Sequence, residues 1–226
     1  MNNFDTIYPQ NFENEKERVQ TYYEKHIKRK MDVFCSILAI LVFWWLYLII
    51  ALLVYIKLGS PIIFKQNRPG KNERLFKLYK FRTMTDSTDK NGNLLPDEMR
   101  LTAFGKILRK SSLDELPEVF NILKGDMSVI GPRPQLVRDM VFMTECQRKR
   151  HQVRPGLSGL AQINGRNNID WEEKLKWDLK YIHKITFVGD MKIIFQTVLK
   201  AFVKQEGITE GDMATAEDYG DYLRRK

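Results

Sequence analysis

The sequence predicts an α+β protein, mostly helical with a short β-hairpin, that carries one N-terminal membrane-inserted helix. Residues 33–56 contain no charged side chain, and at 1.5 Å per residue they exceed the ~30 Å hydrocarbon core of a bilayer. Residues 62–66 and 75–83 read as two short strands around the turn-rich segment 67–72, which predicts a β-hairpin. The remaining patterns are largely helical, and they include amphipathic stretches suited to a membrane interface.

The composition favours an anionic partner. The chain has 226 residues, a net charge of +9 and a pI of about 9.4, which suits lipid headgroups, phosphorylated substrates or nucleic acid. Platforms of alternating aromatic and basic residues are missing from the sequence, so we expect no nucleic-acid partner. The two cysteines, Cys35 and Cys146, do not predict a disulfide, and a reducing cytoplasmic setting is expected for the soluble part.

Basic residues flank the apolar segment on both sides. Because cationic flanks prefer the cytoplasm, a simple span would place one cluster on the wrong side. A re-entrant helix satisfies both clusters, as does a helix lying shallowly in the interface, and we favour the re-entrant arrangement. Trp44 and Trp45 stand near the middle of the segment, although tryptophan prefers the interface.

Several further elements follow from periodicity and from glycine and proline boundaries. Residues before 22 are expected to form a loose tail or a short surface helix, and residues after 205 an extended polar tail. The stretch 154–166 reads as a loop with a short strand. The helix over 191–204 is either core-facing or bound to anionic lipid. The predicted helices cover 101–109, 116–123, 135–151, 169–185 and 191–204.

Two adjacent carboxylates, Asp114 and Glu115, precede Pro117. Proline is tolerated in the first turn of a helix, so we expect a helix to begin near Asp114. Free N–H groups and the macrodipole at this end would keep Asp114 ionised and could also hold a phosphate. The alternative is a purely structural role, with Ser112 and Glu115 forming a capping box or Asp114 acting as the N-cap.

Two cations could complete a site for a diphosphate. Lys80 lies in the second predicted strand, and Arg133 lies between two prolines that restrict its backbone. The alternative for each is a solvated surface charge. The sequence contains no phosphate-binding glycine loop and no Cys/His metal spacing. A metal ion would therefore be oxygen-ligated, such as Mg²⁺ on carboxylates and phosphates.

The ordered motifs of this chain resemble those of the monotopic phosphoglycosyl transferases, also called bacterial sugar transferases. The resemblance covers residues 28 to about 202. Eight motifs carry it: Lys28-Arg29-Lys30-Met31-Asp32, Gln66-Asn67-Arg68-Pro69-Gly70, Phe76-Lys77-Leu78-Tyr79-Lys80-Phe81-Arg82-Thr83-Met84, Ser112-Leu113-Asp114-Glu115-Leu116-Pro117, Asn121-Ile122-Leu123-Lys124-Gly125-Asp126-Met127-Ser128, Gly131-Pro132-Arg133-Pro134, Arg154-Pro155-Gly156 and Gly159-Leu160-Ala161-Gln162.

The resemblance implies transfer of a phosphosugar from a UDP-sugar to undecaprenyl phosphate, with release of UMP. Asp114 matches the nucleophile that would form a covalent phosphosugar intermediate. Glu115 matches its partner, either as a ligand of Mg²⁺ together with Asp114 or in proton transfer. Lys80, Arg133 and Arg154 would bind substrate. Asp190 would either bind substrate or only cap the helix that follows it.

The resemblance also implies a location and a domain order. We expect the bacterial inner membrane, with the catalytic domain on its cytoplasmic face and membrane lipids as partners; association with downstream glycosyltransferases is compatible with this. The expected parts are a polar tail (1–24), the membrane-associated helix (25–60), the catalytic domain (61–204) and a polar tail (205–226). One departure is that Trp44-Trp45 stands where small members of the family have a helix-breaking Ser-Pro pair.

The sequence leaves the reaction class open to two rivals. A membrane-bound glycosyltransferase or phosphodiesterase could use the same acids, and a membrane-anchored scaffold could use the basic charge. The donor sugar is not fixed either; the nearest resemblance is to enzymes that handle acetamido sugars such as diacetylbacillosamine.

Overall fold

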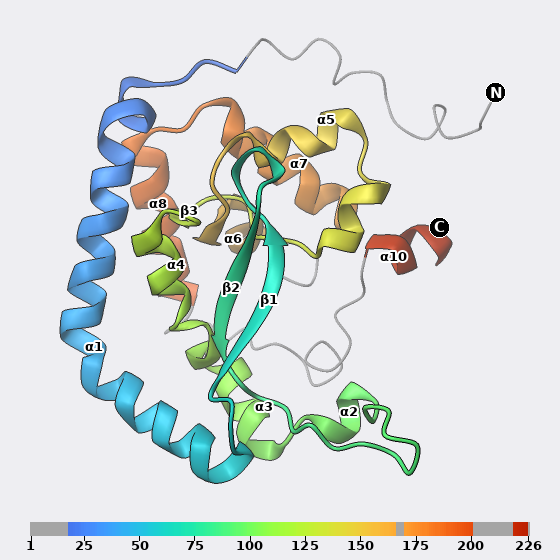
Figure 1. Cartoon of the computed structure of the whole chain (residues 1–226). Helices are drawn as coiled ribbons and strands as arrows, with labels where there is room; N and C mark the ends of the chain where they lie inside the picture. The colour runs from blue at the N-terminus through green and yellow to red at the C-terminus, as the bar shows by residue number, and fades with distance from the viewer. Residues whose placement is uncertain (1–17, 166–169, 201–218, 226) are drawn as a thin grey trace.

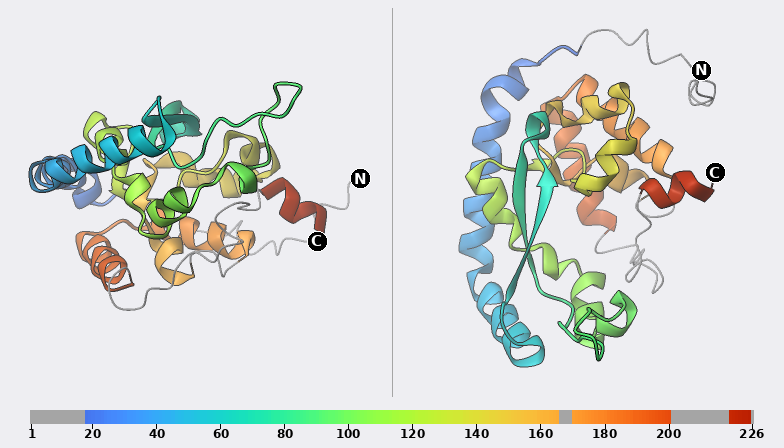
Figure 2. Two further views of the ribbon diagram at one scale, coloured as in Figure 1. Left: turned by 90° about the horizontal axis from the view of Figure 1, so that it is seen from below. Right: turned by 45° about the vertical axis from the view of Figure 1, so that its right-hand side comes forward.

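The computed structural model describes residues 18–165, 170–200 and 219–225. The predicted N-terminal tail up to residue 17, residues 201–204 of the last predicted helix and residues 205–218 lie outside this range. A long helix, α1, runs along one side of a body of short helices and two small sheets (Figures 1 and 2). The predicted α+β class with one long apolar helix is therefore confirmed.

Most of the helices and strands are labelled in Figure 1. The α-helices are α1 (Lys28–Leu58), α2 (Asp97–Arg100), α3 (Ala103–Lys110), α4 (Glu118–Lys124), α5 (Glu145–Arg148), α6 (Leu160–Asn164), α7 (Trp171–His183), α8 (Phe187–Leu199) and α10 (Tyr219–Arg225). The strands are β1 (Ile63–Pro69), β2 (Leu75–Phe81), β3 (Ser128–Ile130) and β4 (Gly156–Ser158). A π-helical turn, η2 (Tyr23–Ile27), precedes α1, and the 3₁₀ turns are η3 (Lys71–Glu73), η4 (Leu113–Glu115), η5 (Val137–Phe142) and η6 (Lys149–Gln152).

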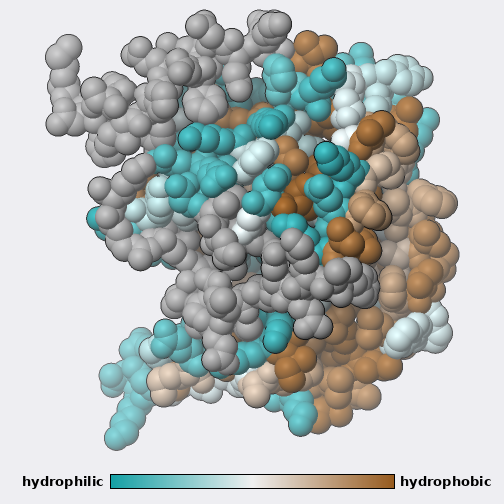
Figure 3. All heavy atoms as spheres, turned by 180° about the vertical axis from the view of Figure 1, so that it is seen from behind, coloured by the Kyte–Doolittle hydropathy of each residue, from teal (hydrophilic) through white to brown (hydrophobic). Residues whose placement is uncertain are grey.

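Helix α1 is long and apolar enough to cross a membrane by length and composition. It stays helical over 31 residues, yet its axis bends around the body (Figure 1). Trp44 and Trp45 are 58% and 49% exposed, so the residues that replace the helix-breaking pair face outward. The apolar surface of α1 forms the brown flank in Figure 3, and its most exposed members are Phe34, Leu41, Trp44, Leu48, Leu52, Tyr55 and Ile56.

The N-terminal half of α1 is bonded to the body by buried or half-buried polar side chains. The Asp32 carboxylate accepts hydrogen bonds from Ser128 Oγ and from the Val129 N–H, both at 3.0 Å. Arg29 donates to the carbonyls of Ile122 and Leu123 at 2.6 and 2.8 Å, which satisfies the free carbonyl end of α4. Arg29 and Asp32 therefore attach the start of α1 to the body.

The C-terminal half of α1 packs on the same body by apolar contact. Ile50 and Val54 are 3% and 0% exposed, and they form a cluster with Phe81 of β2 and Leu108 of α3. Gly59 then ends the helix at a φ of 77°, a conformation that favours glycine. Both halves of α1 thus contact one body.

Strands β1 and β2 pair antiparallel, so the predicted hairpin is confirmed. Phe76 and Leu78 share the buried face of β2 and pack on Ile122 and Met127. Lys80 lies on that same face, because side chains two residues apart along a strand point the same way. The hairpin therefore directs Lys80 toward the start of α4.

Strands β3 and β4 form a parallel pair at very close approach. A Cβ on Gly156 would lie 2.1 Å from the Gly131 backbone nitrogen, so neither chain could come this near with a side chain in place. The Gly131 N–H donates to the Ser158 carbonyl, and the Gly156 N–H donates to the Pro132 carbonyl, each at 2.9 Å. This pairing holds the turn that carries Arg133.

Three predicted elements differ in the structure. The predicted helix over 135–151 is broken into η5, α5 and η6, because Thr144 forms a capping box with Gln147 and begins a new helix there. Within the predicted loop 154–166, residues 160–164 form the short helix α6. Residues 219–225 are helical rather than extended, and Tyr219 is fully buried against Trp171.

Candidate active site

The predicted carboxylate pair lies on the 3₁₀ turn η4, just before α4. Ser112 has a left-handed φ of 56°, which turns the chain sharply after α3. Leu113 and Leu116 pack against the cluster around Ile50 and fix the turn on α1. The prediction that a helix begins near Asp114 is wrong by a turn, since α4 begins at Glu118 with Pro117 as its N-cap. The alternative capping box of Ser112 is absent, since the Ser112 side chain caps no N–H.

The structure brings the predicted Lys80, Glu115 and Arg133 together. Lys80 Nζ lies 2.6 Å from Glu115 Oε1 and 3.2 Å from Glu118 Oε1. Arg133 Nη2 donates to the same Glu115 oxygen at 2.6 Å. Neither cation is therefore an isolated charge, because both converge on one carboxylate, although the Arg133 side chain stays 45% exposed.

The charged groups in this cluster shift one another's pKa values. Burial alone would raise the pKa of Glu115, but Arg133 and Lys80 outweigh it and hold that pKa well below its usual range. Burial, reinforced by the Glu115 charge, raises the pKa of Glu118 to about 7. Glu115 is thus a fixed anion, whereas Glu118 holds a proton part of the time near neutral pH.

Asp114 differs from its two acidic neighbours because its carboxylate is not engaged. It is 8% exposed, and within residues 18–165, 170–200 and 219–225 no hydrogen bond or ion pair reaches its carboxylate. Burial raises its pKa to about 6, while the cations Lys80, Arg109 and Arg133 limit the rise. The expected ionising effect of a helix N-terminus is replaced by these three side-chain charges. A buried carboxylate of this kind, ionised at neutral pH and unengaged, is suited to nucleophilic attack.

Three residues of this region were not predicted as site residues. Glu118 lies four positions after Asp114, a spacing that places side chains on one helical face and could have indicated it. Arg109 reaches the region from α3, where its Nε donates to Thr83 Oγ1 at 3.0 Å. Arg68 of β1 lies near Glu118 and Arg133, and its pKa falls to about 10 through burial. Arg68 lies in the motif Gln66-Asn67-Arg68-Pro69-Gly70, which could have indicated it, whereas Arg109 lies in none of the quoted motifs and reaches the region only through tertiary packing.

The carboxylates are compatible with a magnesium ion shared with substrate. Within the described part of the chain, no group of three or more His, Cys, Asp or Glu side chains could hold a metal by protein ligands alone. Magnesium commonly uses one or two carboxylates together with substrate phosphates. The unengaged Asp114 carboxylate fits that pattern, whereas Glu115 Oε1 is already shared by two cations.

A comparison with known families identifies the chain. The family model described as bacterial sugar transferase matches residues 23–204. This chain belongs to the bacterial sugar transferase family. The match includes α1, the hairpin and the carboxylate cluster, so the resemblance inferred from the motifs is confirmed.

Named relatives of this bacterial sugar transferase include short and long proteins. The "Uncharacterized sugar transferase EpsL" of Bacillus subtilis is 48% identical over 85% of this chain and 95% of its own length. The "UDP-glucose:undecaprenyl-phosphate glucose-1-phosphate transferase" of Klebsiella pneumoniae is 40% identical over 79% of this chain. The "UDP-N-acetylgalactosamine-undecaprenyl-phosphate N-acetylgalactosaminephosphotransferase" of Aeromonas hydrophila is 39% identical over 76% of this chain. The chain spans only 40% and 43% of the lengths of the last two.

The structure does not bring Arg154 to the carboxylate cluster of this sugar transferase. Arg154 Nε donates to the Gly125 carbonyl at 2.8 Å, at the end of α4 opposite Asp114. In this position Arg154 satisfies a free helix carbonyl. Substrate binding by Arg154 stays a prediction without a supporting contact.

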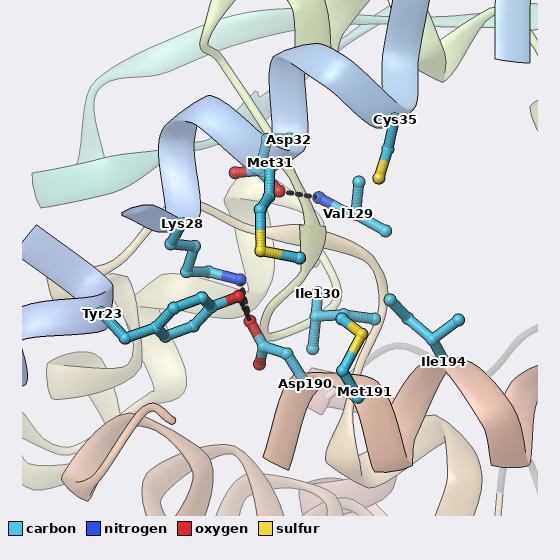
Figure 4. Close-up of a pocket in the computed structure, with 10 residues that line it drawn as sticks. All are labelled: Tyr23, Lys28, Met31, Asp32, Cys35, Val129, Ile130, Asp190, Met191 and Ile194. Atoms are coloured by element: carbon cyan, nitrogen blue, oxygen red, sulfur yellow. Dashed lines mark hydrogen bonds and ion pairs between the residues drawn. The ribbon is translucent and has the colours of Figure 1, made fainter. Parts of the chain in front are cut away.

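Asp190 belongs to a separate buried group between α1 and α8 (Figure 4). Its carboxylate accepts hydrogen bonds from Lys28 Nζ at 2.6 Å, from Tyr23 Oη at 2.8 Å and from Tyr181 Oη at 2.9 Å. At 2% exposure, Asp190 is fully engaged in joining the two helices. The cap that precedes α8 is Thr186, whose side chain accepts from the Gly189 N–H, so the expectation that Asp190 caps the helix is wrong.

Proposed function

We propose that this bacterial sugar transferase moves a phosphosugar from a UDP-sugar to undecaprenyl phosphate and releases UMP. One observation carries the proposal: Asp114 is a buried, unengaged carboxylate beside a second carboxylate that two cations already neutralise. The names of the Klebsiella and Aeromonas relatives describe transfers of this kind to undecaprenyl phosphate. The reaction would be the first membrane step of a glycoconjugate pathway.

The first half-reaction begins at Asp114. Its carboxylate oxygen attacks the β-phosphorus of the UDP-sugar, and the bond from that phosphorus to the bridging oxygen breaks, which releases UMP. A phosphosugar remains on Asp114 as an acyl phosphate. Lys80, Arg109 and Arg133 lower the repulsion between the carboxylate and the diphosphate, because each lies close enough to lower the pKa of Asp114.

In the second half-reaction, a phosphate oxygen of undecaprenyl phosphate attacks the same phosphorus. The acyl phosphate bond breaks, the diphosphate-linked sugar leaves on the lipid, and the Asp114 carboxylate is regenerated. Glu115 fixes Lys80 and Arg133 through both half-reactions, since both bond its Oε1. A magnesium ion held by Asp114 and by Glu115 Oε2, the oxygen that Lys80 and Arg133 do not bond, would neutralise phosphate charge.

The re-entrant arrangement of α1 forms part of the proposal. Asp32, near the start of the helix, is bonded to β3, whereas Val54, near its end, packs beside β2 and α3. A helix with both halves on one body is consistent with entering and leaving the bilayer by one face. We place that body on the cytoplasmic face of the inner membrane, where the basic flanks of α1 meet anionic lipid.

Nucleotide release tests the proposal. The full chain in nanodiscs is given undecaprenyl phosphate, Mg²⁺ and a panel of UDP-sugars. UMP that forms only with certain donors, together with a diphosphate-linked lipid sugar, is the expected result. UDP in place of UMP would assign a glycosyl transfer instead, and the same panel would identify the donor sugar.

A further inference from the structure

Arg150 lies behind the candidate site rather than within it. It belongs to η6 and is 1% exposed. Its guanidinium forms an ion pair with Asp178 of α7, with Nη2 at 2.7 Å and Nε at 3.0 Å from Oδ2. Asp178 is 2% exposed, so two opposite charges are removed from water together.

The same guanidinium also reaches the site's backbone. Arg150 Nη2 donates to the Arg133 carbonyl at 2.6 Å, while the Arg133 side chain bonds Glu115. The carbonyl and the side chain of one residue are thus held by different partners. A continuous chain of bonds links Asp178, Arg150, Arg133 and Glu115.

The turn around Arg133 has few other backbone groups through which the body can hold it. Pro132 and Pro134 have no backbone N–H, so they cannot donate to neighbouring strands. Strand β4 holds the turn on one side, through the Gly131 N–H and the Pro132 carbonyl. The bond from Arg150 fixes the next carbonyl along the chain.

The Arg133 side chain depends on this backbone support. It is 45% exposed, so the surrounding side chains restrict it less than they restrict Lys80, which is 20% exposed. A buried ion pair contributes little net stability compared with an apolar pair of similar volume, but it fixes geometry through its directional bonds. The position of the guanidinium beside Glu115 therefore follows the position of the turn.

We propose that Arg150, buried with Asp178, is a positioning residue that fixes the Gly131–Pro134 turn and so aims Arg133 at the substrate diphosphate. This inference rests on the proposed phosphosugar transfer. Arg150 itself touches no reacting atom. Its effect on turnover passes through Arg133.

The test replaces the ion pair by apolar residues in the full-length protein. The double variant R150M/D178L removes both buried charges and the donor to the Arg133 carbonyl. We expect its melting temperature to stay near that of the wild type, because apolar replacement of a buried pair is often neutral or stabilising. We expect kcat to fall about 10- to 100-fold, the effect of an error of about 1 Å in a substrate-positioning group.

A double-mutant cycle with Arg133→Ala separates positioning from general damage. If Arg150 acts through Arg133, adding R150M/D178L to Arg133→Ala causes little further loss of kcat. Losses that multiply in the combined variant would overturn the inference, as would full activity of R150M/D178L. A wild type that releases no UMP with any donor would instead overturn the proposed function.

Two further variants complete the design. Arg148→Met is the matched control, since Arg148 lies in the same segment but pairs with Glu73 at the hairpin turn, and its kcat should stay within about twofold. Arg150→Lys serves if the double variant does not fold, because it keeps the charge but lacks the planar fork. Its kcat should fall at an unchanged melting temperature, and an unchanged kcat would contradict the inference.

Discussion

The Tyr47 hydroxyl donates to the Leu116 carbonyl at 2.9 Å. Tyr47 belongs to the membrane helix α1, and Leu116 follows the carboxylates Asp114 and Glu115 directly. The apolar helix α1 is thus bonded directly to the turn that carries the candidate site. This contact is consistent with a reaction that takes one substrate from water and the other from lipid.

Asp114→Asn is predicted to abolish turnover and to stabilise the fold. The pKa of Asp114 is raised from 3.8 to about 6, so the folded state binds its proton more tightly than the unfolded chain, and ionisation costs stability as pH rises. The full cost applies above pH 6 and is at most about 3 kcal/mol for two pKa units. Activity assays with Mg²⁺, and melting curves at pH 8 in EDTA, check the two parts. A destabilised variant would mean that Asp114 has a structural partner.

Glu115 and Glu118 offer a matched pair, because Lys80 bonds both. Glu115→Gln should lower kcat about 100-fold, since Lys80 and Arg133 lose the anion that holds them in place. Glu118→Gln should lower it only a few-fold. Glu118 is partly protonated near pH 7 already, and glutamine keeps an oxygen for Lys80. Equal losses in steady-state assays would show that the cluster does not distinguish the two positions.

The rate is predicted to fall on the acid side of pH 6. The attacking form of Asp114 is the carboxylate, and its pKa is raised to about 6, so kcat/KM should drop about tenfold for each pH unit below that value. The pH profile of Glu118→Gln should keep this limb. If the acid side of the profile shifts to another pH in Glu118→Gln, the titrating group is Glu118 instead of Asp114.

Asp190→Asn separates a structural role from substrate binding. Breaking the buried pair with Lys28 should lower the unfolding free energy by about 3–5 kcal/mol, because Lys28 keeps its charge while its side chain is only 11% exposed. The KM for the donor, measured on the folded fraction, should not change. A raised KM at an unchanged melting temperature would restore Asp190 as a substrate-binding residue.

The path of α1 through the bilayer can be tested with single cysteines in a chain that lacks Cys35 and Cys146. Positions Tyr22 and Ser60 flank α1 and are exposed. In spheroplasts, an impermeant maleimide should label neither position until the membrane is permeabilised. Asn91, in an exposed loop of the body, provides the control. Labelling of one flank alone before permeabilisation would indicate a simple span.

Local sequence patterns predicted the parts of the site that depend on local geometry. The sequence predicted the second strand, which carries Lys80, and the acidic pair beside Pro117 indicated the turn of the candidate site. The start of α4 was misplaced because proline also serves as an N-cap, and the left-handed Ser112 produces a 3₁₀ turn. Neither choice is visible in the residue types alone.

The contacts of Asp190 and Arg154 could not be predicted because their partners are distant in sequence. Asp190 bonds Lys28, 162 positions away, and the pair forms only when α8 packs on α1. Arg154 similarly finds the Gly125 carbonyl, 29 positions away. A charged residue in a motif can bind substrate or hold the fold, and its spacing to the next motif does not decide between them.

The two attachments of α1 also limit how this protein can be handled. A chain shortened to remove α1 would leave Phe81 and Leu108 without their packing partners Ile50 and Val54. The acidic turn would also lose its hydrogen bond from the Tyr47 hydroxyl. The water-soluble remainder would lack part of its own interior. The candidate site should therefore stay folded only in detergents and lipids that preserve the bend of α1.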